Sequence, residues 1–223
     1  MKAGRDLPRS EAEIALIRKG ALFVDAGLQE ARKAIRADAS TPSIVESICK
    51  AVRTAGCEAD PDIRIASGFP LSREQVDDRI YGASTLRSSE LASVWISGVH
   101  RNVAFAGERT FPVGPPSGKA RAYLAHLSEA ADWAIDSIEP GKRRRYIPTE
   151  TRGRLLSVRG SGIGTTLGGP PAIEPGAWVE LTPGMAIHLE VTLACATFGT
   201  GAISHMILLG ADSVERLTRF ATS

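Results

Sequence analysis

The same order of helical and extended segments occurs twice along this chain of 223 residues. Ser10 and Glu13 form a capping box, in which a hydroxyl and a carboxylate three positions apart satisfy the first free amides of a helix. Apolar residues then recur at helical spacing as far as Leu28. A second helix is predicted from Thr41-Pro42 to Gly56, because proline fits an early helical position and glycine a C-terminal stop. Extended segments are predicted at 63–66, 91–97 and 99–113, with the last two paired around Gly98.

From Ser117 the order begins again. Apolar spacing predicts a long helix up to Ile138, which ends at Pro140-Gly141, and a shorter helix near Thr149. We therefore predict an α+β domain of two similar halves, about 10–114 and 115–223, with a cleft between them. A generic α+β sandwich fits the same pattern, and the pattern alone leaves both open. In the second half, a glycine-rich loop over 160–171 precedes predicted strands at 178–181, 185–196 and 204–209.

The composition is that of an ordinary soluble domain, with 43% hydrophobic and 23% charged residues. A formal net charge of +2 gives no reason to expect a nucleic-acid partner, and the basic run 142–145 is interpreted as a solvated loop after Pro140-Gly141. No stretch approaches the roughly 20 apolar residues that a membrane span needs. Three cysteines without zinc-type spacing, and an N-terminus without an apolar signal core, predict a cytoplasmic protein with reduced thiols.

Several short motifs resemble those of the pita-bread family, which includes creatinase, methionine aminopeptidase and prolidase. Their order and spacing along the chain make the resemblance specific, although each motif alone is weak. It implies a single pita-bread domain over 1–223, similar in extent to a minimal methionine aminopeptidase. The matching segments are 13–19, 66–68, Arg-Thr-Phe-Pro-Val-Gly at 109–114, Gly-Ser-Gly-Ile-Gly at 160–164 with Pro170-Pro171, and Leu-Thr-Pro-Gly-Met at 181–185 ahead of Glu190.

The resemblance also implies where a pair of metal ions would bind. Catalytic members of the family hold two divalent ions with two aspartates, a histidine and two glutamates. A hard-cation site needs several carboxylates, and this chain keeps one carboxylate of the family's ligand set. We therefore predict that it binds no metal ion and has no metallopeptidase activity. No other cofactor is indicated. Shifting the alignment by one residue moves Glu108 toward the second aspartate, but Trp95 still fills the first position. Carried onto this chain, the ligand positions are Trp95, Ala106, Gly168 or Gly169, Glu190 and Ser204, while two further family histidines fall on Ser161 and near Gln75.

Polar residues on the predicted strands are candidates for metal-independent chemistry. Glu190 and His188 are two positions apart on one strand, so their side chains share a face and are predicted to form a general acid–base pair. His205 is a third catalytic candidate, but Ser204 and His205 point to opposite faces, so at most one of them faces the cleft. A structural role remains the alternative for each residue. The substrate-binding candidates are Trp95, His100, Glu108, Arg109, Ser161 and Ser204.

Two functions of different classes follow from these features. One is a metal-independent lyase, cyclase, isomerase or hydrolase for a small polar or amide-bearing molecule, in line with creatinase, which uses this fold without metal. The other is a non-catalytic peptide- or protein-binding module, like the peptidase-like domain of a histone chaperone. The loss of so many ligands supports the second, whereas the nearly neutral charge argues against a histone-type partner. The family resemblance also predicts a homodimer.

Overall fold

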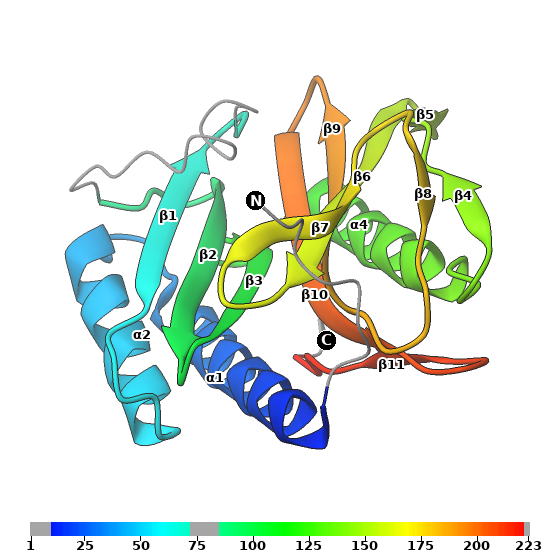
Figure 1. Ribbon diagram of the computed structural model, residues 1–223. Helices are drawn as coiled ribbons and strands as arrows, with labels where there is room; N and C mark the ends of the chain where they lie inside the picture. The colour runs from blue at the N-terminus through cyan, green and yellow to red at the C-terminus, as the bar shows by residue number, and fades with distance from the viewer. Residues whose placement is uncertain (1–9, 72–84, 221–223) are drawn as a thin grey trace.

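A computed structural model describes residues 10–71 and 85–220 of the chain (Figure 1). Within these residues, helices pack on one face of a large sheet, and a β-hairpin crosses the other face. The first half consists of α1 (Glu11–Ala34), α2 (Thr41–Thr54), β1 (Asp62–Gly68), β2 (Leu91–His100) and β3 (Val103–Pro112). The second half consists of α4 (Gly118–Asp136), β4 (Arg143–Arg145), β5 (Thr149–Thr151), β6 (Arg154–Ile163), β7 (Leu167–Ile173), β8 (Trp178–Glu180), β9 (Ala186–Cys195), β10 (Gly199–Leu209) and β11 (Val214–Arg216).

The first two helices begin at the capping residues that the sequence predicts. The Ser10 hydroxyl accepts a hydrogen bond from the Glu13 amide at 3.3 Å, and the Glu13 carboxylate accepts one from the Ser10 amide at 2.9 Å, which confirms the capping box. α2 carries a proline in its first turn and ends two residues before Gly56, whose φ of +99° suits glycine. Among the described residues, no helix combines the length and the apolar run that a bilayer span needs.

The two halves meet in the middle of one continuous sheet. Its strand order is β1-β2-β3-β10-β9-β6-β5, so β3 of the first half lies beside β10 of the second. These two strands pair through Arg109 and Ile203. The Thr110 hydroxyl extends the junction, because it accepts from the Ala202 amide at 2.8 Å and donates to the Ala202 carbonyl at 3.2 Å. The Thr110 side chain thus takes the place of a pair of backbone hydrogen bonds between β3 and β10, at the point where the two halves join.

Helices cover one face of this sheet and set which strand residues are internal. α1 lies against β2 and β3, and α4 lies against β9 and β10. Gly107 faces α1 so closely that a Cβ atom there would lie 2.2 Å from Val24 Cγ1, so this position requires glycine. On α4, the Tyr123 hydroxyl accepts from the Gly201 amide at 2.6 Å and donates to the Leu193 carbonyl at 2.5 Å, which ties β9 and β10 to the helix. The opposite face of the sheet is left open to form a cleft.

Three of the wrong local predictions concern one turn and two short segments. The β2–β3 turn is at Arg101 and Asn102, which both have positive φ, whereas Gly98 lies inside β2 and packs on Phe105. Asparagine tolerates this conformation in a tight hairpin, so it can replace glycine at the turn. The segment near Thr149 forms β5 instead of a helix, because it pairs with β6. The basic run is also partly ordered, since β4 pairs with β8.

The glycine-rich segment 160–171 was predicted to be a loop and is mostly strand. Gly160 and Gly162 continue β6 beside β9, and Gly168 lies on β7, which folds back along β6. Small residues are needed there because a Cβ atom at Gly162 would lie 2.0 Å from the Pro170 carbonyl oxygen. The glycines therefore permit close strand contact in a hairpin that crosses the open face (Figure 1).

Candidate active site

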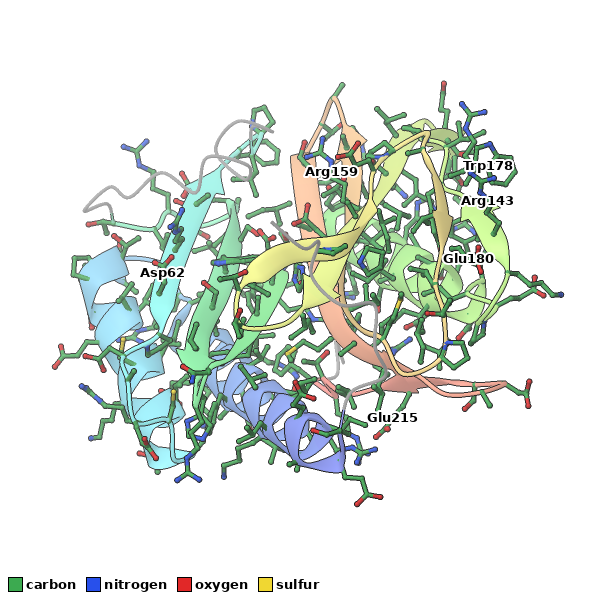
Figure 2. All side chains as sticks on the ribbon, in the orientation of Figure 1. Asp62, Arg143, Arg159, Trp178, Glu180 and Glu215 are labelled. Atoms are coloured by element: carbon green, nitrogen blue, oxygen red, sulfur yellow. The ribbon has the colours of Figure 1, made fainter. Side chains whose placement is uncertain are left out.

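A cavity of about 420 Å³ opens on the face of the sheet that the helices leave uncovered. Strands from both halves line it: β1 and β2 on one side, and β6, β7 and β9 on the other. Asp62 of β1 and Arg159 of β6 mark these two sides in Figure 2. This is the location predicted for the cleft, because a duplicated domain places its site where strands of the two halves face each other.

The wall from the first half carries an ion pair and an indole ring. Asp62 and Arg64 alternate along β1 and so point to the same face, where two guanidinium nitrogens of Arg64 lie 2.8 and 2.9 Å from Asp62 Oδ2. On β2, Trp95 lies opposite Arg64, and Ser97 lies opposite Asp62. The Trp95 indole N–H donates to the Ser97 hydroxyl at 2.9 Å. The first half therefore presents both signs of charge beside an aromatic surface.

The wall from the second half carries the predicted acid–base pair. His188 and Glu190 share one face of β9, and each has a polar neighbour directly across on β6: Ser161 opposite His188, and Arg159 opposite Glu190. Side chains in such cross-strand positions are adjacent, so the guanidinium and carboxylate of the second pair have complementary charge. The Ser161 hydroxyl also accepts from the Gly168 amide at 3.1 Å, which anchors the start of β7 at the edge of the cavity.

An aromatic contact joins the two walls. The Trp95 and His188 rings lie edge to face, with centroids 5.2 Å apart and an interplanar angle of 83°. Their exposures are 7% and 6%, so both rings are largely buried and form the floor of the cavity. Such a contact fixes the plane of the imidazole and limits its movement.

Comparison with known proteins identifies the fold and the family. Residues 15–211 match metallopeptidase family M24. The chain belongs to this family. An uncharacterized hydrolase/peptidase, y4tL, from Sinorhizobium fredii is 25% identical over 190 residues, which are 81% of this chain and 49% of the relative. The chain thus spans about half the length of the curated relative that it matches.

Solved structures confirm the pita-bread fold. The prolidase from Pyrococcus furiosus superimposes with a TM-score of 0.76 at 18% sequence identity, over 95% of this chain and 65% of the prolidase. The methionine aminopeptidase from Thermotoga maritima superimposes with a TM-score of 0.71 at 17% identity, over 96% of this chain and 99% of the aminopeptidase. At these identities the likeness shows the fold alone, so the chemistry must be argued from the residues in the cavity.

The donor atoms around the cavity do not fit the metal pair that the M24 resemblance implies. Trp95 and Gly168 line the cavity, Ala106 lies beside it opposite Ser97, and Ser204 lies opposite Glu190. An indole N–H is a donor, and neither methyl nor glycine offers a ligand, so Glu190 is the one carboxylate at these positions. In residues 10–71 and 85–220, no group of three or more histidine, cysteine, aspartate or glutamate side chains is placed to hold a metal ion. Gln75 lies outside the described residues.

Most of the predicted site residues lie on the cleft side of the sheet. Glu190, His188, Trp95 and Ser161 line the cavity. Glu108 lies opposite Trp95 on the same face, but it is 1% exposed and accepts from the Ser93 hydroxyl at 2.7 Å. Ser204 is equally buried, and within the described chain its hydroxyl has no hydrogen-bond partner. Glu108 and Ser204 therefore lie beneath the surface of the cavity, where they pack behind the residues that line it.

The other three candidates, His100, Arg109 and His205, lie on the face that the helices cover. The physical reason is that successive side chains of a strand point to opposite faces. Each of these three residues is an odd number of positions from a residue of its own strand that faces the cleft. His100 ends β2 and packs edge to face on Phe23 of α1, with ring centroids 5.1 Å apart. We therefore assign His100 to the helix–sheet interface and not to the cavity.

Arg109 and His205 form a buried cluster that holds the C-terminal segment. Arg109 Nη2 donates to the Phe220 carbonyl at 2.9 Å and lies 3.4 Å from His205 Nε2, while His205 Nδ1 lies 3.0 Å from the Thr218 hydroxyl. Burial lowers the pKa of His205 well below its usual value, and the nearby Arg109 charge lowers it further. Burial also lowers the pKa of Arg109 to about 10. A neutral imidazole beside a buried guanidinium is a structural arrangement, separated from the cleft by the sheet.

Four polar residues of the cavity were missed by the sequence reasoning: Asp62, Arg64, Ser97 and Arg159. The available signal was alternation: Asp62 and Arg64 flank Ile63, so an extended segment that begins one residue before the predicted 63–66 places both side chains on one face. The same holds for Arg159 and Ser161 around Gly160. The second pair was hidden by the prediction of a loop over 160–171, and a loop has no defined faces.

Proposed function

We propose that this M24 member acts without metal on a small polar or amide-bearing molecule bound in the cleft. The observation that carries the proposal is the placement of Glu190 and His188 together in one cavity, with the Trp95 ring packed against His188. The family resemblance assigns the position of Trp95 to a metal ligand, which supports the proposal. A metal-bound water as nucleophile requires several ligands that this cavity does not supply. A carboxylate and an imidazole remain, and these are common general acid–base groups.

Charges on the cavity walls support a substrate with both donor and acceptor groups. Arg64 and Arg159 can donate to a carbonyl or carboxylate oxygen, while Asp62 and Glu190 can accept from an amide, ammonium or guanidino N–H. The cavity volume of about 420 Å³ lies in the range of small-molecule sites. This arrangement favours a compact polar substrate over an extended apolar one.

In the proposed mechanism Glu190 accepts a proton from the bound molecule, and protonated His188 donates one to the atom that gains electron density. Trp95 positions the imidazole by packing against its ring. Both side chains leave β9 on the same face, so they reach the same ligand from one wall. A lyase, cyclase, isomerase or hydrolase step is compatible with this pair, and the substrate decides among them.

The test is turnover in the presence of chelator. The purified protein, dialysed against EDTA, is incubated with small amides, guanidino acids and Xaa-Pro dipeptides, and conversion is followed by NMR. We expect conversion that EDTA does not abolish. The rate of conversion should fall roughly 10²–10⁴-fold in Glu190→Gln, the usual contribution of a general base. Glu180→Gln is the matched control, because Glu180 is an exposed residue of β8. Hydrolysis that requires added metal, or turnover unchanged in Glu190→Gln, would refute the proposal.

The Trp95–His188 packing also supports a second candidate, a non-catalytic peptide- or protein-binding module. An imidazole held by an aromatic neighbour is a fixed recognition group as well as a possible acid. Saturable binding of an Xaa-Pro dipeptide without any conversion, weakened in Glu190→Gln, would favour this candidate. A cytoplasmic location and the absence of nucleic-acid and membrane partners stay predictions.

A further inference from the structure

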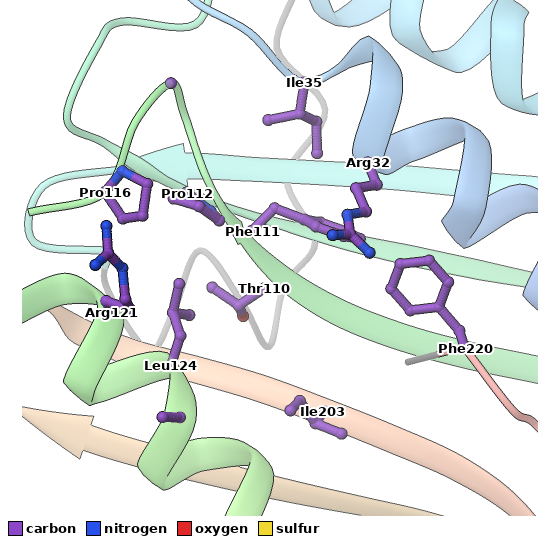
Figure 3. Close-up of a pocket in the computed structure, with 12 residues that line it drawn as sticks. Arg32, Ile35, Thr110, Phe111, Pro112, Pro116, Arg121, Leu124, Ile203 and Phe220 are labelled. Atoms are coloured by element: carbon purple, nitrogen blue, oxygen red, sulfur yellow. The ribbon is translucent and has the colours of Figure 1, made fainter. Parts of the chain in front are cut away.

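A second cavity lies on the other side of the molecule, on the face that the helices cover. Its volume is about 530 Å³, compared with about 420 Å³ for the cleft cavity. Figure 3 shows it between α1, α4 and the end of β3, where the two halves adjoin. We refer to this cavity, bounded by Arg32, Phe111, Arg121, Ile203 and Phe220, as the back pocket.

The back pocket exists because the two halves diverge beyond their central junction. β3 and β10 pair at Arg109 and Ile203, and the next link is the side chain of Thr110. α1 packs on the strands of the first half and α4 on those of the second, so a space remains between the two helices. The cavity is therefore built into the duplicated fold and does not depend on the cleft residues.

Its interior is apolar and preformed. Phe111 and Ile203, which are 7% and 2% exposed, form the base of the pocket. Phe220 packs on Phe111 with ring centroids 5.9 Å apart, and its backbone is held in place because the Asp25 carboxylate accepts from the Phe220 amide at 3.0 Å. Leu124 of α4 completes the apolar surface (Figure 3). Such a surface favours a hydrocarbon chain or ring over a polar ligand.

The mouth of the pocket is positively charged. Among the described residues that line it, the charged ones are Arg32 on α1 and Arg121 on α4, both exposed and on opposite sides (Figure 3). Asp25 lines an adjoining hollow, together with Lys33 and Arg219. Its carboxylate accepts from the Arg219 amide at 2.8 Å, so it is already engaged with the C-terminal segment. The rim therefore complements an anion.

We propose that the back pocket binds a small-molecule carboxylate with an apolar chain or ring. Arginine recognises a carboxylate through paired N–H donors, and the apolar interior would bury the hydrocarbon part. The volume is within the range of preformed small-molecule pockets. This site is separate from the cleft, so its occupancy does not depend on Glu190 or His188.

Decanoate is the probe, titrated into the whole protein by calorimetry and by NMR. We expect saturable binding of one decanoate per chain and no comparable binding of 1-decanol or of decyltrimethylammonium. The affinity for decanoate should fall about tenfold or more in Arg121→Glu, since hydrogen bonds to charged groups contribute about 1.5–3 kcal/mol. Leu124→Trp should abolish binding, because the larger ring fills the pocket. Thermal melts establish that each variant is folded.

Two control variants locate the site. Lys50→Glu makes the same reversal of charge at an exposed position of α2, and Glu190→Gln alters the cleft. Binding should be unchanged in both. Equal affinity for decanol, retention of binding in both Arg121→Glu and Leu124→Trp, or loss of binding in Glu190→Gln would overturn the proposal. Binding of a leucine-terminated peptide in preference to decanoate would overturn the assignment to a small molecule.

Discussion

The indole of Trp95 lies edge to face against the imidazole of His188, with ring centroids 5.2 Å apart. Trp95 belongs to β2 of the first half and His188 to β9 of the second, so the contact spans the cleft. Trp95 also stands at the position that the family resemblance assigns to the first metal-binding aspartate. A buried aromatic pair thus joins the halves where an M24 metallopeptidase would join them through metal ions and carboxylates.

Replacing Trp95 with alanine should destabilise the fold by about 3 kcal/mol, because truncating a buried aromatic residue removes its contacts and leaves a cavity. The free energy of unfolding measured in urea tests this. Trp178→Ala is the matched control, and it should cost well under half as much because Trp178 is 59% exposed. Equal losses in the two variants would show that the Trp95 contact does not stabilise the protein.

Purified protein should contain no stoichiometric transition metal, and added Mn²⁺ or Co²⁺ should not raise its melting temperature. The reason is the donor set: Trp95, Ala106, Gly168 and Ser204 contribute no carboxylate or imidazole beside Glu190. Elemental analysis and thermal melts with each ion check this. Close to two ions per chain, with peptidase activity that a chelator abolishes, would contradict it.

Stability should fall as the pH drops below about 6.5, the ordinary pKa of histidine. The pKa of His205 is lowered in the folded state by burial and by Arg109, so below that pH the unfolded chain binds a proton that the folded chain does not. Between the two pKa values the loss is at most about 1.4 kcal/mol per pH unit. His205→Gln should reduce this slope, which urea unfolding between about pH 5 and 8 measures. The pKa of His126 is also lowered by burial, so part of the slope should remain.

Tyr123→Phe should lower the free energy of unfolding by about 1–3 kcal/mol, because it leaves the buried Gly201 amide without its acceptor. The ring itself is retained, so the loss reports the hydrogen bonds to Gly201 and Leu193 and not the packing of α4. Urea unfolding gives the difference, and hydrogen exchange at the Gly201 amide should become faster. An unchanged exchange rate would show that the tyrosine hydroxyl does not protect this amide.

The chain should form a homodimer, an expectation that rests on the frequent pairing of its family. Analytical ultracentrifugation at high micromolar concentration tests it directly. A monomer under these conditions would contradict this expectation.

Local patterns in the sequence determined the helices, most strands and the family. Capping at Ser10 and proline in the first turn of α2 depend on neighbouring residues, so they are visible without a structure. The Leu-Thr-Pro-Gly-Met segment likewise placed Glu190 in the cavity, and strand alternation put His188 on the same face. Alternation also separated Ser204 from His205, but it did not indicate which of them faced the cleft.

Tertiary structure decided that question, because the inner face of a strand depends on which helix packs against it. α4 covers the face of β10 that carries His205, so the imidazole is buried with Arg109 instead of lining the cavity. Long-range strand pairing likewise brought Asp62 and Arg64 to the same cavity as Arg159, which is far away in sequence. The turn at Arg101–Asn102 and the strands within 160–171 also depended on pairing. The local sequence specifies which secondary structure each segment can form. Which strands pair, and which face of a strand is buried, result from the free energy of packing the whole chain.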